Sequence, residues 1–203
     1  MIRIVILWFL SMFAFIGVSA QNAENVLNRA IATYNSAKGV SADFSVSSSQ
    51  GVSSGKIEMS GNKFRILSAD VKCWFDGKTQ WSYSTATGEV NITTPTVEDM
   101  QMSNPYVALS SMKKSCYVYK AYTQVPGYYT LKLVPKLKSN EIKQILLYVT
   151  NGSYNISKAY FEMKSGATYT TKISNYKVVS LGESTFRFNK KDVPADAEII
   201  DLR

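Results

Sequence analysis

The sequence predicts one mostly-β domain in which an opening helix and a short helical insert accompany about ten or eleven antiparallel strands. Three observations indicate this fold class: apolar residues alternate with period two over most of the chain, turn residues separate the alternating runs, and only two regions have helical signals. This many antiparallel strands in one domain is typical of a sandwich or an open barrel. Residues 21–203 are enough for one substantial core, so we expect a single domain.

Residues 1–20 have the pattern of a secretory signal peptide. Arg3 precedes an apolar run over residues 4–16, and residues 18–20 supply the small side chains of a cleavage site. The apolar run is shorter than a membrane span, and a retained anchor helix is the alternative. We therefore expect cleavage before Gln21 and a soluble protein outside the cytoplasm.

A helix is predicted between Asn22, which can cap its start, and Gly39, which can close its end. Its apolar stripe consists of Ala23, Val26, Leu27, Ala30, Ile31 and Tyr34. Period two then begins at Val40 and continues through the pairs of short strands that follow. Further strands are predicted over residues 89–93, 116–122, 128–134, 142–150, 158–164, 167–179 and 184–188.

The dipeptide Asp76-Gly77 is the strongest hairpin signal in the chain, because a type I′ turn needs positive φ at both central residues. A two-residue turn there would place Phe75 opposite Lys78. One face of the hairpin would then carry Trp74, Trp81 and Tyr83, and the other face would carry Val71, Cys73 and Phe75. Bulky apolar groups on both faces predict a sheet that is covered on both sides at this point.

The alternating pattern breaks once, over residues 94–111, where two short helices are predicted. Thr96 and Asp99 have the spacing of a capping box, and Asn104 followed by Pro105 is a second helix start. A curved sheet of this size has a concave face that side chains, a helix or a ligand must fill. The methionine-rich insert is suited to cover a cavity there, although ordinary core packing of the methionines is the alternative.

The absence of histidine removes the usual general base and the commonest metal ligand. Residues 51–55 match the G-x-S-x-G pattern but lack its histidine partner and its helix, so we predict a flexible turn. Cys73 and Cys116 form either a disulfide or two buried free thiols. We expect no catalytic residue, no metal and no cofactor.

The chain is basic, with 23 lysines and arginines against 15 acidic residues and a net charge of +8. This charge favours an anionic membrane surface or an acidic partner, or it belongs to solvated strand faces. We expect no nucleic-acid partner.

Several motifs, in order along the chain, resemble the LolA family of periplasmic carriers of outer-membrane lipoproteins. Residues 74–83 resemble the family's DGKT-x-W-x-Y hairpin, and residues 104–109 resemble its TPF-x-L lid helix. Further matches are residues 40–46 with the first strand, 131–136 with the L-T-P-K strand end, and 186–188 and 193–200 with the closing strand and tail. The resemblance extends over nearly all of residues 22–203.

The resemblance implies an unclosed antiparallel β-barrel whose N-terminal helix and inserted helices form a lid over an apolar cavity. It implies a soluble periplasmic carrier that receives acylated lipoproteins from an inner-membrane release complex and delivers them to an outer-membrane acceptor. We expect a monomer. The family has an arginine that bonds the lid shut near residues 60–62; no arginine stands there, and Lys63 or Arg65 lies a few residues away.

The one-faced alternation of the strands and the apolar insert assign candidate site residues. The acyl-chain cavity is predicted to be lined by Phe44, Ile57, Met59, Phe64, Ile66, Phe161 and Met163, and the lid by Met100, Met102, Tyr106, Val107 and Leu109. Three other functions are compatible with the residues: a lipid sensor on the same fold, a secreted enzyme that uses carboxylates such as Asp43, Glu98 or Asp99, and a structural envelope or adhesion domain. The carboxylates have no spacing that indicates a shared site.

Overall fold

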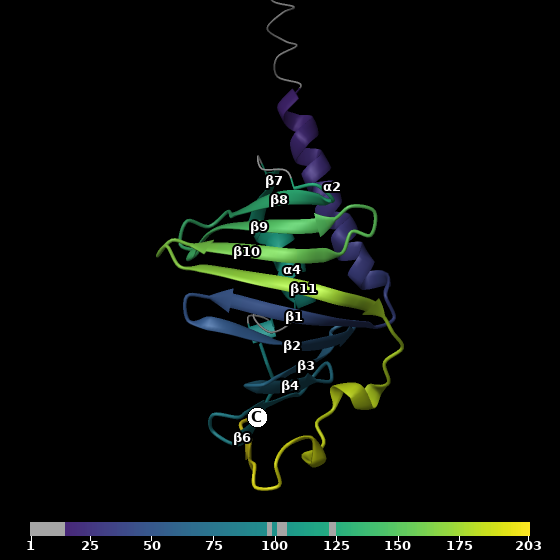
Figure 1. Cartoon of the computed structure of the whole chain (residues 1–203), viewed down its shortest axis with the longest axis vertical. Helices are drawn as coiled ribbons and strands as arrows, with labels where there is room; N and C mark the ends of the chain where they lie inside the picture. The colour runs from purple at the N-terminus through teal and green to yellow at the C-terminus, as the bar shows by residue number, and fades with distance from the viewer. Residues whose placement is uncertain (1–14, 97–98, 101–104, 122–124) are drawn as a thin grey trace, which may run out of the picture.

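The structure is a computed structural model that describes residues 15–96, 99–100, 105–121 and 125–203, and its main element is one unclosed twelve-stranded sheet (Figure 1). The strands are β1 (Val40–Ser48), β2 (Gly51–Ser60), β3 (Lys63–Ser68), β4 (Val71–Phe75), β5 (Gln80–Ser84), β6 (Glu89–Thr93), β7 (Cys116–Lys120), β8 (Tyr128–Pro135), β9 (Ile142–Thr150), β10 (Ile156–Met163), β11 (Thr168–Val178) and β12 (Glu198–Asp201). Their order in the sheet is β12-β6-β5-β4-β3-β2-β1-β11-β10-β9-β8-β7. The predicted mostly-β, unclosed antiparallel sheet with an N-terminal helix is confirmed, with twelve strands.

Two helices, α2 (Phe15–Ser36) and α4 (Pro105–Ser115), lie on one side of the sheet, behind β9–β11 in Figure 1. We call this side the inner face. Their buried side chains and those of β7–β10 form the helix core: Ala23, Val26, Leu27, Ala30, Leu109, Cys116, Val118, Leu131, Leu133, Ile145, Leu147, Val149 and Ile156. Complete burial of a leucine such as Leu27 stabilises the fold by about 1.5–3 kcal/mol, so the apolar stripe holds α2 on the sheet.

The ends of α2 differ from the prediction. The helix begins no later than Phe15, so Asn22 lies inside it and does not cap its start. Gly39 does not adopt a left-handed conformation; a Cβ there would lie 2.6 Å from the carbonyl oxygen of Val179, so this glycine permits a close backbone approach. Within the described part of the chain, no helix is long and apolar enough to cross a membrane.

Residues 51–55 form the first half of β2, and the prediction of a flexible turn there is wrong. The chain reverses earlier, at Ser49 and Gln50. Gly55 pairs with Phe44 on one side, and a Cβ at Gly55 would lie 2.2 Å from the carbonyl oxygen of Leu67 on the other. Glycine is therefore required by the close approach of β2 and β3.

The β4–β5 hairpin has the predicted faces but a different register. Phe75 pairs with Gln80 and not with Lys78, because residues 76–79 form a longer loop. In this loop the Asp76 carboxylate accepts hydrogen bonds from the backbone N–H groups of Lys78 and Thr79, at 3.0 and 2.9 Å. A shift of two residues leaves every side chain on its predicted face, so Trp74 still lies on the face opposite Phe75.

The C-terminal segment covers the outer face of the sheet at β3–β6. Its contacts form the tail cluster, which contains Trp74, Tyr83, Val90, Val193 and Ala197, with Leu67, Trp81 and Phe188 packed against it. The strand predicted over residues 184–188 is wrong, because residues 183–186 form a short 3-10 helix, η1 (Glu183–Phe186), which precedes a second, η2 (Lys190–Asp192). The chain ends beside β6 in strand β12, which pairs parallel to it. The expected covering of both faces is therefore confirmed.

Candidate functional site

A second apolar cluster lies on the inner face, over β1–β4 and next to the helix core. We call it the insert cluster: Ala42, Ile57, Met59, Phe64, Cys73, Phe75 and Met100 are buried, and Tyr34, Phe44, Ile66, Val107, Ile173 and Tyr176 pack against them. The strand residues of this cluster point to one face of the sheet because side chains alternate along each strand, as the sequence predicts. Met100 and Val107 belong to the insert, so the insert packs directly on the strands.

The structure brings seven of the predicted site residues together and separates others. The seven are Phe44, Ile57, Met59, Phe64, Ile66, Met100 and Val107. Phe161 and Leu109 pack in the neighbouring helix core, and the half-buried Met163 lies in neither cluster. Met102 and the side chain of Tyr106 lie outside the described residues. The role of all these residues in ligand binding stays a prediction.

The start of the insert has the predicted capping box. The Thr96 hydroxyl oxygen accepts a hydrogen bond from the Asp99 N–H at 3.2 Å, and the Asp99 carboxylate accepts one from the Thr96 N–H at 2.8 Å. Hydrogen bonds from Thr96 lower the pKa of Asp99 below its usual value, so Asp99 stays ionised as a cap. The Met100 N–H bonds the Thr96 carbonyl at 3.1 Å, which fixes Met100 in the first turn.

Burial is uneven within the insert cluster. Phe64 is fully buried, whereas Phe44 and Ile66 are half-buried. Phe44 lies between Gly55 on β2 and Ile173 on β11. The sheet therefore offers apolar surface to an incoming molecule at Phe44 and Ile66, beside the part that the insert already covers.

Neither basic residue near the family's arginine position forms a hydrogen bond or ion pair with a described residue of the insert. Arg65 Nε donates to Glu58 Oε2 at 2.7 Å, and Lys63 Nζ lies 2.5 Å from a carboxylate oxygen of Glu183. Both side chains leave β3 on the outer face, opposite Phe64. Lys63 and Arg65 therefore do not replace the arginine latch, and the side chains of Met100 and Val107 pack in the apolar insert cluster.

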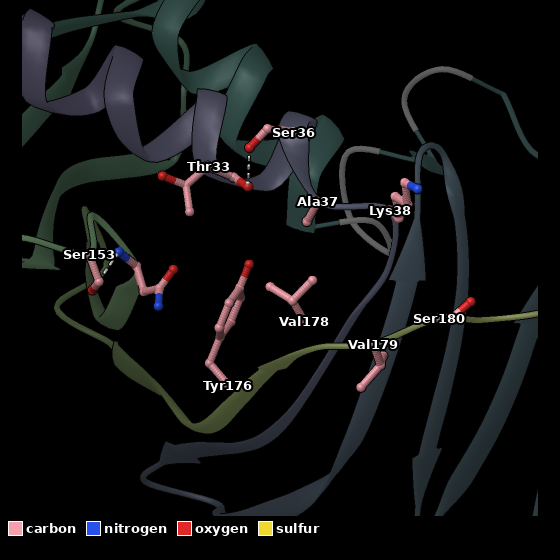
Figure 2. Close-up of a pocket in the computed structure, with 10 residues that line it drawn as sticks. Thr33, Ser36, Ala37, Lys38, Ser153, Tyr176, Val178, Val179 and Ser180 are labelled. Atoms are coloured by element: carbon pink, nitrogen blue, oxygen red, sulfur yellow. Dashed lines mark hydrogen bonds between the residues drawn. The ribbon is translucent and has the colours of Figure 1, made fainter.

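A pocket of about 590 Å³ lies where the end of α2 meets the end of β11 and the β9–β10 turn (Figure 2). Its lining residues are Thr33, Ser36, Ala37, Lys38, Ser153, Asn155, Tyr176, Val178, Val179 and Ser180. The buried Tyr176 hydroxyl and the Asn155 side-chain carbonyl have no hydrogen-bond partner among the described residues. We call this the tyrosine pocket.

Tyr176 joins the tyrosine pocket to the insert cluster. Its ring packs against that cluster and lies edge-on to Tyr34, with the ring centroids 5.9 Å apart, while its hydroxyl points toward α2 (Figure 2). Burial raises the pKa of both phenols, so both stay neutral at physiological pH. Tyr176 was included in a predicted strand, but no sequence signal identified it as a pocket residue, because the partners come from three distant segments.

The two cysteines are free and buried, so the structure has the second of the two predicted alternatives, two buried free thiols. Cys73 belongs to the insert cluster and Cys116 to the helix core, on β4 and β7. Burial raises the pKa of Cys73 to about 12, although a hydrogen bond from Ser82 lowers this pKa by a smaller amount. Burial also raises the pKa of Cys116.

We expect both thiols to resist iodoacetamide at pH 8 in the folded protein and both to react in urea, because buried thiols carry little thiolate. Mass spectrometry counts the adducts. Since folding raises the pKa of Cys73, its contribution to stability is complete below about pH 9 and is lost as the pH rises toward 12. No adduct in urea without reductant would indicate a disulfide between them.

Among the described residues, no three acidic or cysteine side chains gather closely enough to hold a metal ion. Two of the carboxylates considered for catalysis have separate structural partners. Asp99 caps a helix, and Asp43 accepts a hydrogen bond from the Asn175 amide at 2.6 Å. Glu98 lies outside the described residues. The candidate site on the inner face is therefore the apolar insert cluster.

Comparison with known proteins agrees with this geometry. A family model described as outer membrane lipoprotein carrier protein LolA matches residues 10–167. None of the curated proteins matches the sequence significantly.

Several solved structures are similar to this chain at low sequence identity. An uncharacterized conserved protein from Thermus thermophilus has a TM-score of 0.61 and 14% identity, covering 89% of this chain and 99% of that one. MucB has a TM-score of 0.51 and 11% identity, covering 89% and 66%. A LolA superfamily protein from Nitrosomonas europaea has a TM-score of 0.44 and 13% identity, covering 82% and 97%. At identities this low, the first two likenesses show a shared fold.

Proposed function

Because the chain belongs to the LolA family of outer membrane lipoprotein carrier proteins, we propose that it binds the acyl chains of lipoproteins on the inner face of its sheet and carries them from the inner to the outer membrane. One observation carries the assignment of the site. The insert residues Met100 and Val107 pack on a continuous apolar surface of β1–β4, which is where acyl chains would take their place. The protein would act in the periplasm, after cleavage of residues 1–20.

A carrier must shield a large apolar area from water. Each buried methylene contributes about 0.8 kcal/mol, so a chain with about 14 buried methylenes represents on the order of 11 kcal/mol. When the insert moves aside, acyl chains replace the packing of Met100 and Val107 on the buried strand residues of the insert cluster. Apolar contacts are exchanged for apolar contacts, so opening needs no broken ion pair of Lys63 or Arg65.

The tyrosine pocket suits the polar junction of a lipid. Acyl chains end in ester or amide groups, which must keep hydrogen bonds when the chains are buried. The Tyr176 hydroxyl can donate a hydrogen bond to a carbonyl oxygen, and the pocket adjoins the insert cluster through the Tyr176 ring. We assign this junction to the pocket, with the chains extending toward Phe44.

Native mass spectrometry of residues 21–203 tests the proposal, with a triacylated lipopeptide and its unacylated twin as ligands. We expect a one-to-one complex with the acylated peptide alone. A folded protein that binds neither peptide, or both equally, would contradict acyl-chain binding. A deletion strain separates a carrier from a sensor, because lipoproteins accumulate at the inner membrane only when a carrier is lost.

A further inference from the structure

Five exposed lysines from three segments of the chain gather at one corner of the molecule. Lys113 and Lys114 end α4, Lys136 and Lys138 follow β8, and Lys164 follows β10. In Figure 1 the β8–β9 and β10–β11 turns lie side by side at the left ends of these strands. We call this group, with Tyr117 and Leu137, the basic corner.

Hydrogen bonds hold the segments of the basic corner together. Lys136 Nζ donates to the Lys114 carbonyl at 2.8 Å, and the Lys136 N–H donates to the Ser115 carbonyl at 2.8 Å. Lys164 Nζ donates to the Lys138 carbonyl. These bonds leave the ammonium charges in place, because carbonyl oxygens carry no net charge.

Positive charge at the basic corner is not neutralised by its neighbours. None of the five lysines forms an ion pair with a described residue. Residues 113–115, 136–141 and 164–166 contain these five lysines and one acidic residue, Glu141. Two of the lysines also complement the dipole at the end of α4, but Lys136, Lys138 and Lys164 lie on turns. The helix dipole therefore does not account for the cluster.

Large apolar side chains stand exposed among these lysines. Leu137 is 71% exposed and lies between Lys136 and Lys138, and Tyr117 is 53% exposed with Lys136 Nζ 5.7 Å from its ring centroid. Exposed apolar tips ringed by lysines fit a lipid headgroup layer, where the charges meet phosphate groups and the tip enters the interface. Protein interfaces favour arginine and are depleted in lysine, and the corner contains no arginine.

We propose that the basic corner docks the protein on an anionic phospholipid membrane. Docking places the last turn of α4 at the membrane, and the same helix carries Val107 of the insert cluster. The proposal does not depend on cargo, so it is tested with protein that has bound no lipopeptide.

Flotation with vesicles measures the docking of residues 21–203. We expect binding to vesicles with 30% phosphatidylglycerol in phosphatidylcholine at low salt, loss of binding in 0.5 M NaCl, and no binding to pure phosphatidylcholine. Each lysine near an anionic surface strengthens binding about fivefold, so Lys113→Gln with Lys138→Gln should weaken it about 25-fold. Neither ammonium group makes a hydrogen bond or ion pair in the described structure, so this double variant should fold.

The matched control removes the same charge elsewhere. Lys190 and Lys191 are exposed on η2, at the opposite end of the sheet order from the basic corner, so Lys190→Gln with Lys191→Gln should leave binding within about twofold. Leu137→Asn should weaken binding without changing the charge. Equal losses in the two double variants, or equal binding to neutral and anionic vesicles, would overturn the proposal. Failure of flotation alongside normal lipopeptide binding would reject membrane docking and leave the carrier function intact.

Discussion

Phe44→Asp is expected to lower the affinity of the protein for a triacylated lipopeptide by at least about 100-fold, while the protein stays folded. Phe44 is half-buried on the inner face of β1, so an aspartate there keeps access to water in the empty protein. Bound acyl chains would remove that water and leave the charged carboxylate buried against apolar groups. A 100-fold loss corresponds to about 2.7 kcal/mol.

Ser45→Asp is the matched control for this prediction. Ser45 is the next residue of the same strand and points to the outer face, opposite Lys172 of β11. The variant adds the same charge to the same strand, and isothermal titration calorimetry compares the two affinities. Unchanged affinity in Phe44→Asp, or equal losses in both variants, would show that the acyl chains bind elsewhere.

The faces of the strands could be predicted from the sequence, whereas their partners could not. Alternation assigns Phe44, Ile57 and Phe64 to one face because side chains of a strand point to opposite sides in turn. It does not show how the halves of the sheet join. Strands β1 and β11, far apart in sequence, are neighbours, which places Phe161 of β10 beside the helix core.

The length of the turn at Asp76-Gly77 and the last strand could not be predicted from the sequence either. Asp76-Gly77 indicates a reversal, but the Asp76 carboxylate also bonds two N–H groups and lengthens the loop. Strand β12 was not predicted because its four residues are too few for a clear alternation, and it is defined by pairing with β6. The apolar outer face of the hairpin was the sequence signal that such a cover exists.

Trp74→Ala is expected to lower the free energy of unfolding by about 3–5 kcal/mol, the cost of truncating a fully buried large aromatic side chain. Trp74 is 1% exposed at the centre of the tail cluster, and its ring meets Phe188 edge-on with the centroids 5.4 Å apart. The loss combines the apolar area of the indole with the contacts that hold the C-terminal segment. Urea unfolding followed by circular dichroism measures it.

Two further variants separate these contributions. Trp81 is half-buried in the same cluster, so Trp81→Ala should cost less than Trp74→Ala. Phe188→Ala leaves the indole in place but opens its cover, so the combined fluorescence of Trp74 and Trp81 should shift to longer wavelength as water reaches the Trp74 ring. An unchanged emission spectrum in Phe188→Ala would show that the tail does not shield Trp74, and the outer face of β3–β6 would then need another explanation for its apolar side chains.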